Sequence, residues 1–381
     1  MTRQFRSGGD SGETPNGLEP SDWVDRMRED ARRGRYGPLS ATDFAAWRHF
    51  LKRCPLASEE HLVDCVRGDI AQHRTEAIAR WDGDRIVAGA HLWFRRMRFV
   101  PGCALRMLGG GLYERTPSTD DLDELLDAVR DHTRPDKPIF IEWGLRLPRI
   151  VGDRELEEHR HVTTWLARRG LEPTPMLDAT FWVDLSGSED EILGRMHHMF
   201  RRNIRKADRD GVTCRQVGPE MADTFYDMNM KMAGLKRLDT AFFGVGSRTH
   251  FVEFISGLLK AEAAALFCAE WNGLIRNMVL ITRIGTPRYV YGATGEEARG
   301  DERPPPTGQI LHWEVMRWLR SLGFGTYDLG GTPAREVSSD HPNFGVWQFK
   351  TRLGGQYVEF FHKHRLTCRP ILSRAYRMWR G

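Results

Sequence analysis

A lysine near the end of the chain stands between an aromatic run and glycine pairs. The stretch 327–355 reads YDLGGTPAREVSSDHPNFGVWQFKTRLGG, with Phe349 and Lys350 between the pairs at 330–331 and 354–355. Glycine lets the backbone approach a ligand closely or take a positive φ. A single lysine held by such turns is suited to negative charge on a ligand. The alternative is an ordinary strand, a loop and a hydrophobic return strand.

The strand before this loop ends in polar and flexible residues that lie close to the lysine in sequence. They are Tyr327, Asp328, Gly330 and Gly331. Asp328 is a candidate general base, and its alternative role is that of a structural acid accepting hydrogen bonds at a strand end. The loop Thr332–Asn343 could close over a ligand, which makes it a candidate lid.

A second set of charged residues lies on one predicted helix, Ser188–Asp210. Apolar residues recur along it at i, i+3, i+4 spacing, which predicts one buried face, and Gly211 suits its C-terminal end. Arg201, Arg202 and Arg205 fall among few acids. Arginine binds phosphate bidentately, so this cluster predicts an anion- or nucleic-acid-binding surface. The alternative is a solvated charged face.

The loop before the predicted helix Gln309–Leu322 bears on the choice of acyl donor. It contains the triple proline Pro304–Pro306 and one glycine, Gly308. Acetyltransferase-type folds use glycines here to offer backbone N–H groups to a pyrophosphate, whereas proline has no N–H. The sequence therefore disfavours acyl-coenzyme A binding in the usual way.

The order of predicted elements repeats along the chain. Each half gives helices, a hairpin across an Asp-Gly or Asn-Gly turn, and then a helix between strands. The hairpin strands are 76–81 with 85–93, and 263–271 with 274–284. The repeat predicts an α/β fold with mixed (α+β) sheets in two copies, one over 21–176 and one over 177–365.

Other elements complete this order. Helices are also predicted at 41–52, 61–68, 119–132, 160–170, 220–236 and 249–260, and strands at 138–143, 177–185, 212–217, 288–293, 326–329 and 357–362. Gly109–Gly111 lacks the Lys-Ser/Thr of a phosphate-binding loop, so we interpret it as a bend or a close backbone approach. Residues 1–20 are predicted to be a disordered tail. The basic segment 366–381 either docks as a helix or touches an anionic membrane.

Composition sets the class of protein. Hydrophobic residues make up 40% and charged residues 28% of 381 residues, as in a globular protein, and the net charge of +4 excludes a basic coat for nucleic acid. No apolar run reaches the ~18 residues of a membrane span, and the N-terminus has no secretory signal. Six scattered cysteines without a CxxC pair indicate neither a zinc site nor a disulfide framework. We therefore expect a cytoplasmic protein with no metal site.

Three motifs occur together in a fixed order. They are FRRNIRKADRDGV at 200–212, LHWEVMRWLRSLGFGTYDLGG at 311–331 after YGAT, and GVWQFKTRLGG at 345–355. In this combination the chain resembles the Fem-type family, the non-ribosomal peptidyltransferases that build peptidoglycan cross-bridges. The resemblance in sequence covers residues 177–362. Before residue 177 only the predicted fold resembles that of the family. No long charged heptad insertion lies between 236 and 249, so the chain resembles the short members without a coiled-coil arm.

The resemblance implies a fold, an activity and a set of site residues. It implies two acetyltransferase-like (GNAT-type) domains in tandem, and transfer of an amino acid from aminoacyl-tRNA to an amine without acyl-coenzyme A, metal or other cofactor. It places Lys350 with Phe349 at the transfer centre, where Lys350 would donate to the oxyanion or the tRNA terminal phosphate. Arg201 and Arg205 match a region that helps hold acceptor phosphates, and 327–331 matches the family's YD.GG strand.

Further roles follow from these. Arg202 would join the other two arginines in anchoring an anionic acceptor or the tRNA backbone, and Trp347 would wall the site and stack on the terminal adenine. Thr307–Gly308 stands where the family usually has a tyrosine or asparagine-tyrosine. The acceptor stays open between a peptidoglycan precursor and a small natural-product amine, and neither the amino acid nor the oligomeric state is indicated. Two other functions stay open: an acyl-coenzyme A-dependent N-acyltransferase and a non-catalytic RNA-binding module.

Overall fold

The structure is a computed structural model, and it describes most of the chain. The described residues are 33–65, 73–96, 101–174, 178–235, 247–295 and 304–380. The predicted tail 1–20 lies outside these ranges.

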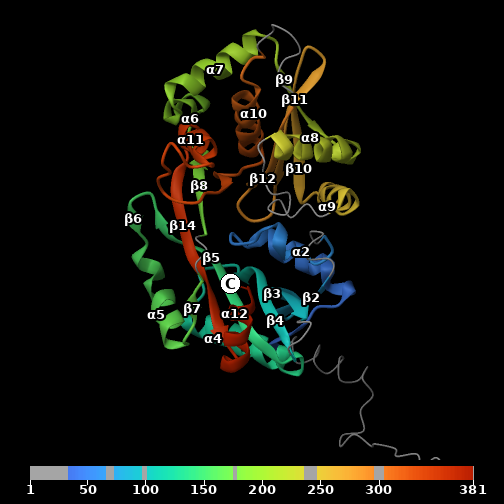
Figure 1. The fold of residues 1–381 in the computed structure, drawn as a ribbon, viewed down its shortest axis with the longest axis vertical. Helices are drawn as coiled ribbons and strands as arrows, with labels where there is room; N and C mark the ends of the chain where they lie inside the picture. The colour runs from blue at the N-terminus through green and yellow to red at the C-terminus, as the bar shows by residue number, and fades with distance from the viewer. Residues whose placement is uncertain are drawn as a thin grey trace, which may run out of the picture.

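The first half of the chain forms a sheet in the order β1-β2-β3-β4-β5, with helices packed on it (Figure 1). Its strands are β1 Arg33–Pro38, β2 Arg74–Asp82, β3 Arg85–Arg96, β4 Cys103–Tyr113, β5 Pro138–Val151, β6 Arg154–Glu155 and β7 Glu172–Pro173. Its helices are α2 Phe44–Arg53, α4 Thr119–Thr133 and α5 Arg160–Arg168. Helix α4 shows how the sequence produces such a helix. Ser118 and Asp121 form a capping box at its start, and Leu122, Leu125 and Val129 recur on the face that packs on the sheet.

The second half forms a sheet in the order β8-β13-β12-β11-β10-β9. Its strands are β8 Ala179–Asp184, β9 Thr213–Val217, β10 Ala264–Trp271, β11 Leu274–Thr282, β12 Arg288–Thr294, β13 Thr326–Gly331 and β14 Gln356–Thr367. Its helices are α6 Glu189–Arg195, α7 His198–Arg209, α8 Ala222–Leu235, α9 Arg248–Lys260, α10 Thr307–Ser321, α11 Phe344–Arg352 and α12 Pro370–Arg380. Asn272 and Gly273 both have positive φ, as the predicted hairpin turn requires.

Strand β14 joins the two sheets into one. Its first residues pair with β8 and the rest pair antiparallel with β5, so it crosses from the upper to the lower half of the molecule (Figure 1). The mixed α/β class predicted from the sequence is confirmed. The predicted strand 357–362 is only the first part of β14, and a strand shared by both halves leaves the limits 21–176 and 177–365 a prediction.

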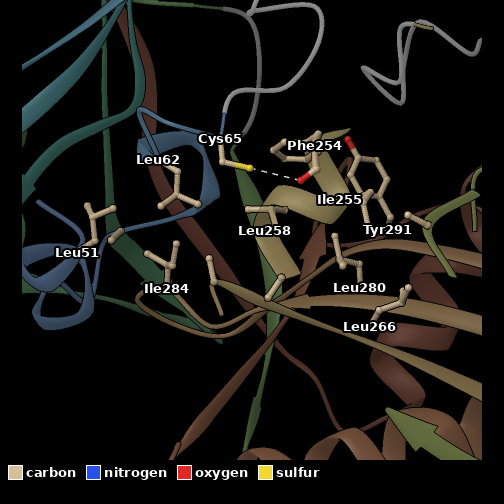
Figure 2. Packing of buried hydrophobic residues seen from close by; sticks show 14 of the residues in the cluster. Leu51, Leu62, Cys65, Phe254, Ile255, Leu258, Leu266, Leu280, Ile284 and Tyr291 are labelled. Atoms are coloured by element: carbon tan, nitrogen blue, oxygen red, sulfur yellow. Dashed lines mark hydrogen bonds between the residues drawn. The ribbon is translucent and has the colours of Figure 1, made fainter. Parts of the chain in front are cut away.

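The two halves also share a hydrophobic core. Leu51 and Leu62 of the first half lie in one cluster with Phe254 and Leu258 of α9, as Figure 2 shows. The Cys65 thiol donates to the Phe254 carbonyl oxygen at 3.4 Å. Burial of apolar surface between the halves therefore fixes their relative position.

The predicted helix Ser188–Asp210 is broken into α6 and α7, so the prediction of one continuous helix is wrong. Its predicted start and end are confirmed: Ser188 and Glu191 form a capping box, and Gly211 takes a φ of 77°. Met196 has an extended backbone with a ψ of 152°. The His197 N–H donates to the Arg352 carbonyl oxygen at 2.9 Å. This tertiary hydrogen bond, made to the last turn of α11, replaces an intrahelical one, which a helical spacing pattern does not reveal.

The predicted helix 61–68 is also wrong in its described part. A single 3₁₀ turn, Glu59–His61, takes its place, because the His61 ring is fully buried against the glycines of β4. A Cβ added at Gly109 would lie 2.2 Å from that ring, and the His61 Nε2 contacts the Gly110 carbonyl oxygen at 3.2 Å. The triple glycine is thus the close backbone approach that the sequence predicted.

Candidate active site

Lys350 lies on α11 and reaches the end of β13. Its ammonium donates to the carbonyl oxygens of Gly330 at 2.9 Å and Gly331 at 2.6 Å, and the residue is only 5% exposed. Gly330 has a φ of 77°, and a Cβ there would lie 2.7 Å from the Tyr289 carbonyl oxygen. The first glycine pair therefore brings backbone oxygens to the lysine. The alternative of a hydrophobic return strand at Lys350 is wrong, because α11 is a helix.

The second glycine pair ends α11. Gly354 has a φ of 85°, and the Gly355 N–H donates to the Lys350 carbonyl oxygen at 3.2 Å. This is a common way to end a helix, since glycine takes the left-handed conformation without strain. It also leaves no room at Gly355, where a Cβ would lie 2.9 Å from the Phe181 side chain. Close packing at Gly355 thus fixes the position of α11, the helix that carries Lys350, relative to β8 and β13.

The charge of Lys350 is set by its surroundings. Burial lowers the pKa of Lys350 to about 8; the carboxylate of Asp328 opposes this shift, and Arg288 adds to it. An ammonium has three N–H donors. Two are held by the glycine carbonyl oxygens, so one remains for a ligand. A lysine with a pKa near the working pH and one free donor is suited to stabilising a developing oxyanion.

Asp328 links the end of β13 to both halves of the chain. It is 2% exposed, and its Oδ1 accepts from the Gly330 N–H at 2.8 Å and lies in hydrogen-bond reach of the Thr180 hydroxyl. Its Oδ2 accepts from Arg146 Nη2 of β5 at 3.3 Å. Both carboxylate oxygens are occupied, which is the structural role that the sequence left as the alternative to a general base. Its negative charge also favours the protonated form of Lys350.

Aromatic rings bring the three sequence motifs together around Lys350. The Phe349 ring lies 5.4 Å from Phe200 of α7 and 5.2 Å from His312 of α10, measured between centroids. The His312 Nδ1 and the Tyr327 hydroxyl are 2.9 Å apart. Burial and the nearby charge of Lys350 lower the pKa of His312 to about 3. This histidine is therefore neutral and positions Tyr327 and Phe349 rather than carrying charge.

A cavity of about 230 Å³ lies between the halves, beside Asp328. Its walls come from both halves and are mainly apolar; they are Pro55, Leu56, Ala57, Ser58, Tyr113, Arg115, Thr116, Arg146, Leu147, Pro148, His159, Trp182, Thr282, Thr286, Arg288, Asp328 and Phe360. Three arginines line it, and two of them pair with a buried acid of the other half: Arg146 with Asp328, and Arg288 with Glu59. Such a cavity suits a small polar group held by guanidinium donors.

The three arginines of the predicted anion-binding surface differ in their surroundings. Arg201 is half-buried, and its Nη1 donates to the Gly194 carbonyl oxygen at 2.9 Å, which holds α7 to the end of α6. Arg202 and Arg205 are exposed and form no ion pair within the described ranges. Phe200 lies on the same helix and contacts Phe349, so α7 carries both a buried contact to the lysine site and these exposed positive charges.

The loop Thr332–Asn343 is tied down in this structure. Trp347 donates its indole N–H to the Arg335 carbonyl oxygen at 2.9 Å, and Arg335 pairs with Asp153 of the first half at 2.7 Å. The expected stacking role of Trp347 and the expected lid are therefore proposals that require this contact to open. In the part of the chain that the structure describes, no cluster of three or more His, Cys, Asp or Glu residues could hold a metal ion.

Comparisons with known proteins agree with the observed fold. Residues 194–350 match the acetyltransferase (GNAT) domain family. The lipid II:glycine glycyltransferase of Staphylococcus epidermidis is 32% identical over 101 residues, which cover 26% of this chain and 23% of that protein. The Staphylococcus aureus protein is 31% identical over 101 residues with the same coverage. The structure of FemX superposes with a TM-score of 0.75 at 14% identity and covers 90% of this chain and 99% of that one.

The chain is therefore similar to FemX in fold, and to the staphylococcal glycyltransferases in sequence over about a quarter of its length. The tandem acetyltransferase-like architecture expected from the sequence is confirmed. The chain spans less than a quarter of the length of the staphylococcal relatives that it matches in sequence.

Several residues of this candidate site were not found from the sequence. Thr180 and His312 lie in segments that the sequence placed on a strand and a helix, but their partners come from other elements. Arg146 of β5 and Arg288 of β12 line one cavity because the packing of the two halves brings their strands together. Since no spacing along the chain encodes that contact, the only available signal was the charge of each residue inside an apolar strand.

Proposed function

We propose that this chain transfers an aminoacyl group from aminoacyl-tRNA to an amine acceptor and forms an amide bond. The observation that carries the proposal is the buried Lys350 ammonium with one free N–H donor. Lys350 is held at the end of β13, the strand whose Asp328 lines the cavity between the halves. The acceptor amine would bind in the cavity, the reacting carbonyl would meet Lys350, and the exposed arginines of α7 would bind the anionic tRNA.

The chemistry needs little beyond alignment and charge stabilisation. The acceptor amine attacks the ester carbonyl carbon of the aminoacyl group, and a tetrahedral oxyanion forms. The third N–H of Lys350 donates to that oxyanion. As the intermediate collapses, the ester C–O bond breaks and the amide C–N bond remains. The proton lost by the attacking nitrogen is taken up by the leaving ribose oxygen, which restores the tRNA hydroxyl. The ester is already activated, so we propose that no cofactor or metal takes part.

The acceptor amine enters through the cavity between the halves. Arg146 and Arg288 would hold a polar group next to the amine, and Phe360 and Trp182 would cover its apolar part. The volume of about 230 Å³ holds only the end of a larger acceptor. The relatives' names specify lipid II as acceptor, which supports a peptidoglycan precursor here, and a small natural-product amine fits the same cavity. We place the reaction in the cytoplasm, where tRNA is charged.

The start of α10 supports tRNA over acyl-coenzyme A as donor. Its N-cap residue is Pro306, which makes no side-chain cap, and the residues before it are prolines. A pyrophosphate would lack the row of backbone N–H donors that glycine loops offer. The free charge of Arg202 and Arg205 instead suits a nucleic-acid backbone.

The direct test uses a pool of charged tRNAs with candidate amines, read by mass spectrometry. We expect the acceptor to gain the mass of one aminoacyl residue in a reaction that ribonuclease abolishes. Product formed from acyl-coenzyme A in the absence of tRNA would instead support the tandem N-acyltransferase. Salt-sensitive RNA binding without any product would support the binding module.

The rate should depend on the protonation of Lys350. Because the pKa of Lys350 is lowered to about 8, its ammonium is lost as pH rises through about 8, whereas an ordinary lysine keeps its charge to about 10.4. The acceptor amine also loses a proton in this range, so the quantity to measure is the ratio of wild-type to Lys350→Met rates. We expect this ratio to fall about tenfold per pH unit above 8. A ratio that rises through the same range would show that neutral Lys350 acts as a base.

The exposed arginines of α7 should govern tRNA binding but not chemistry. Replacing Arg202 and Arg205 together by alanine removes two charges without breaking an ion pair seen in the described ranges. We expect KM for aminoacyl-tRNA to rise about tenfold with kcat nearly unchanged, and the salt dependence of binding to weaken by about one phosphate contact per arginine. The control replaces Arg160 and Arg168, two exposed arginines of α5 that pair with Glu157 and Asp123, and should leave KM unchanged. A fall in kcat alone would contradict the assignment.

A further inference from the structure

The C-terminal helix α12 docks on the first half with one side and leaves an apolar side exposed. On the docked side, the Tyr376 ring lies 5.2 Å from Phe140, and Leu372 packs against the same cluster. On the other side, Ile371 and Met378 are 85% and 75% exposed. They are seven residues apart, which places them two turns apart on one face. The docking expected from the sequence therefore accounts for only one side of this helix.

The exposure of this pair is high for the molecule. The other large hydrophobic side chains that the described residues expose are Leu274, Leu322 and Val346, each between 44% and 49%. Removing an aliphatic side chain from water is favourable, and α12 offers two such side chains together. Single exposed hydrophobic residues need no explanation, but a pair on one helix face next to charges indicates a binding surface.

The surroundings of this face are basic. The segment 366–381 contains four arginines and no acid; they are Arg369, Arg374, Arg377 and Arg380. Arg374 is exposed and lies between Ile371 and Met378 on the helix. Burial raises the pKa of the Cys368 thiol, and the charges of Arg130 and Arg369 oppose this shift, which places Arg130 of α4 near the start of α12.

We propose that the exposed face of α12, formed by Ile371, Arg374 and Met378, binds the surface of an anionic membrane. Aliphatic side chains enter the acyl boundary while arginines meet the lipid phosphates, as in interfacial helices. No helix of the described ranges is long and apolar enough to cross a membrane, so the contact is peripheral. Figure 1 shows α12 in the lower half of the molecule and α7 and α11 in the upper half, so the contact leaves the lysine site free.

Two other occupants fit this face less well. A second copy of the chain, docked by two-fold symmetry, would bring the same arginines against each other. RNA would engage the arginines but gains little from exposed isoleucine and methionine, since bases stack on aromatic rings. An anionic bilayer satisfies both the charge and the aliphatic pair. The inference rests on α12 alone and does not depend on the proposed transfer reaction.

The test is cosedimentation of the full chain with vesicles, without tRNA or acceptor. One set of vesicles contains phosphatidylglycerol and the other only phosphatidylcholine. We expect binding to the first set alone, weakened by salt. Replacing Ile371 and Met378 together by serine should lower the affinity at least about tenfold. The matched control replaces Leu274 and Leu322, exposed leucines of the second half, and should bind as the wild type does.

Each other outcome overturns the proposal. Wild-type protein that stays in solution with phosphatidylglycerol vesicles has no such surface. Equal binding of the Ile371→Ser/Met378→Ser variant places the contact elsewhere. A wild-type dimer that the same variant dissociates in analytical ultracentrifugation assigns the face to a second copy. Circular dichroism of each variant shows that its fold is intact, as is expected for substitutions at exposed positions.

Discussion

Replacing Lys350 by methionine is expected to lower the rate of amide formation by a factor of about 10²–10³, which is the usual effect of removing one oxyanion donor. Methionine keeps the length of the side chain but has no N–H. The glycine carbonyl oxygens at 330 and 331 then lose their donor. Because the desolvation cost of a buried ammonium is removed at the same time, we expect only a small change in stability. Single-turnover kinetics with saturating charged tRNA measure the effect, and KM should change little.

Lys363 provides the control for this substitution. It is a partly buried lysine of β14 whose pKa is also lowered by burial, with Arg146 adding to the shift, and it does not line the cavity. Lys363→Met should therefore retain nearly full activity, while both variants keep the circular dichroism spectrum of the wild type. If Lys350→Met also turned over within about twofold of the wild-type rate, the lysine would not contact the reacting carbonyl.

Replacing Asp328 by asparagine is expected to have the second largest effect. The amide keeps an oxygen for the Gly330 N–H but loses the charge that pairs with Arg146 and opposes the low pKa of Lys350. The ammonium of Lys350 is then lost at a lower pH. The rate at pH 8 should therefore fall about tenfold for each pH unit by which the alkaline fall of the pH–rate profile moves down. The stability should fall by about 2 kcal/mol, because Arg146 loses a charged hydrogen-bond partner. The pH–rate profile separates the two effects.

Asp153→Asn is the matched control for Asp328→Asn. Asp153 also pairs with an arginine across the two halves, Arg335, but its side chain is 99% exposed. An exposed ion pair contributes little to stability, so this variant should keep both its stability and its pH profile. If the rate of Asp328→Asn falls at the same alkaline pH as that of the wild type, the carboxylate has a structural role only.

Local signals in the sequence were sufficient for most of the fold. The hairpin at Asn272–Gly273 and the capping box at Ser188 depend on neighbouring residues, and both are confirmed. The break at Met196 depends on a hydrogen bond to Arg352, which lies far along the chain. The length of β14 likewise depends on strands of the first half that it pairs with. Elements fixed by long-range contacts were therefore the ones that the spacing patterns missed.

The candidate site was predictable to the same extent. The glycine pairs pointed to Lys350, because glycine is required wherever backbone must pass close to a side chain. Asp328 was visible as an acid at a strand end, but its partners Thr180 and Arg146 come from β8 and β5. The cavity between the halves could not be predicted, since its walls come from segments that only the shared core brings together.

The most direct test of the account uses one purified aminoacyl-tRNA as the sole donor, with no ATP, synthetase or acyl-coenzyme A present. The wild-type chain, an amine acceptor and this donor are mixed, and both products are followed by mass spectrometry. We expect that the acceptor gains one aminoacyl residue, that uncharged tRNA appears in equal amount, and that Lys350→Met forms neither at a comparable rate. An acceptor modified only when acyl-coenzyme A is supplied would contradict this expectation.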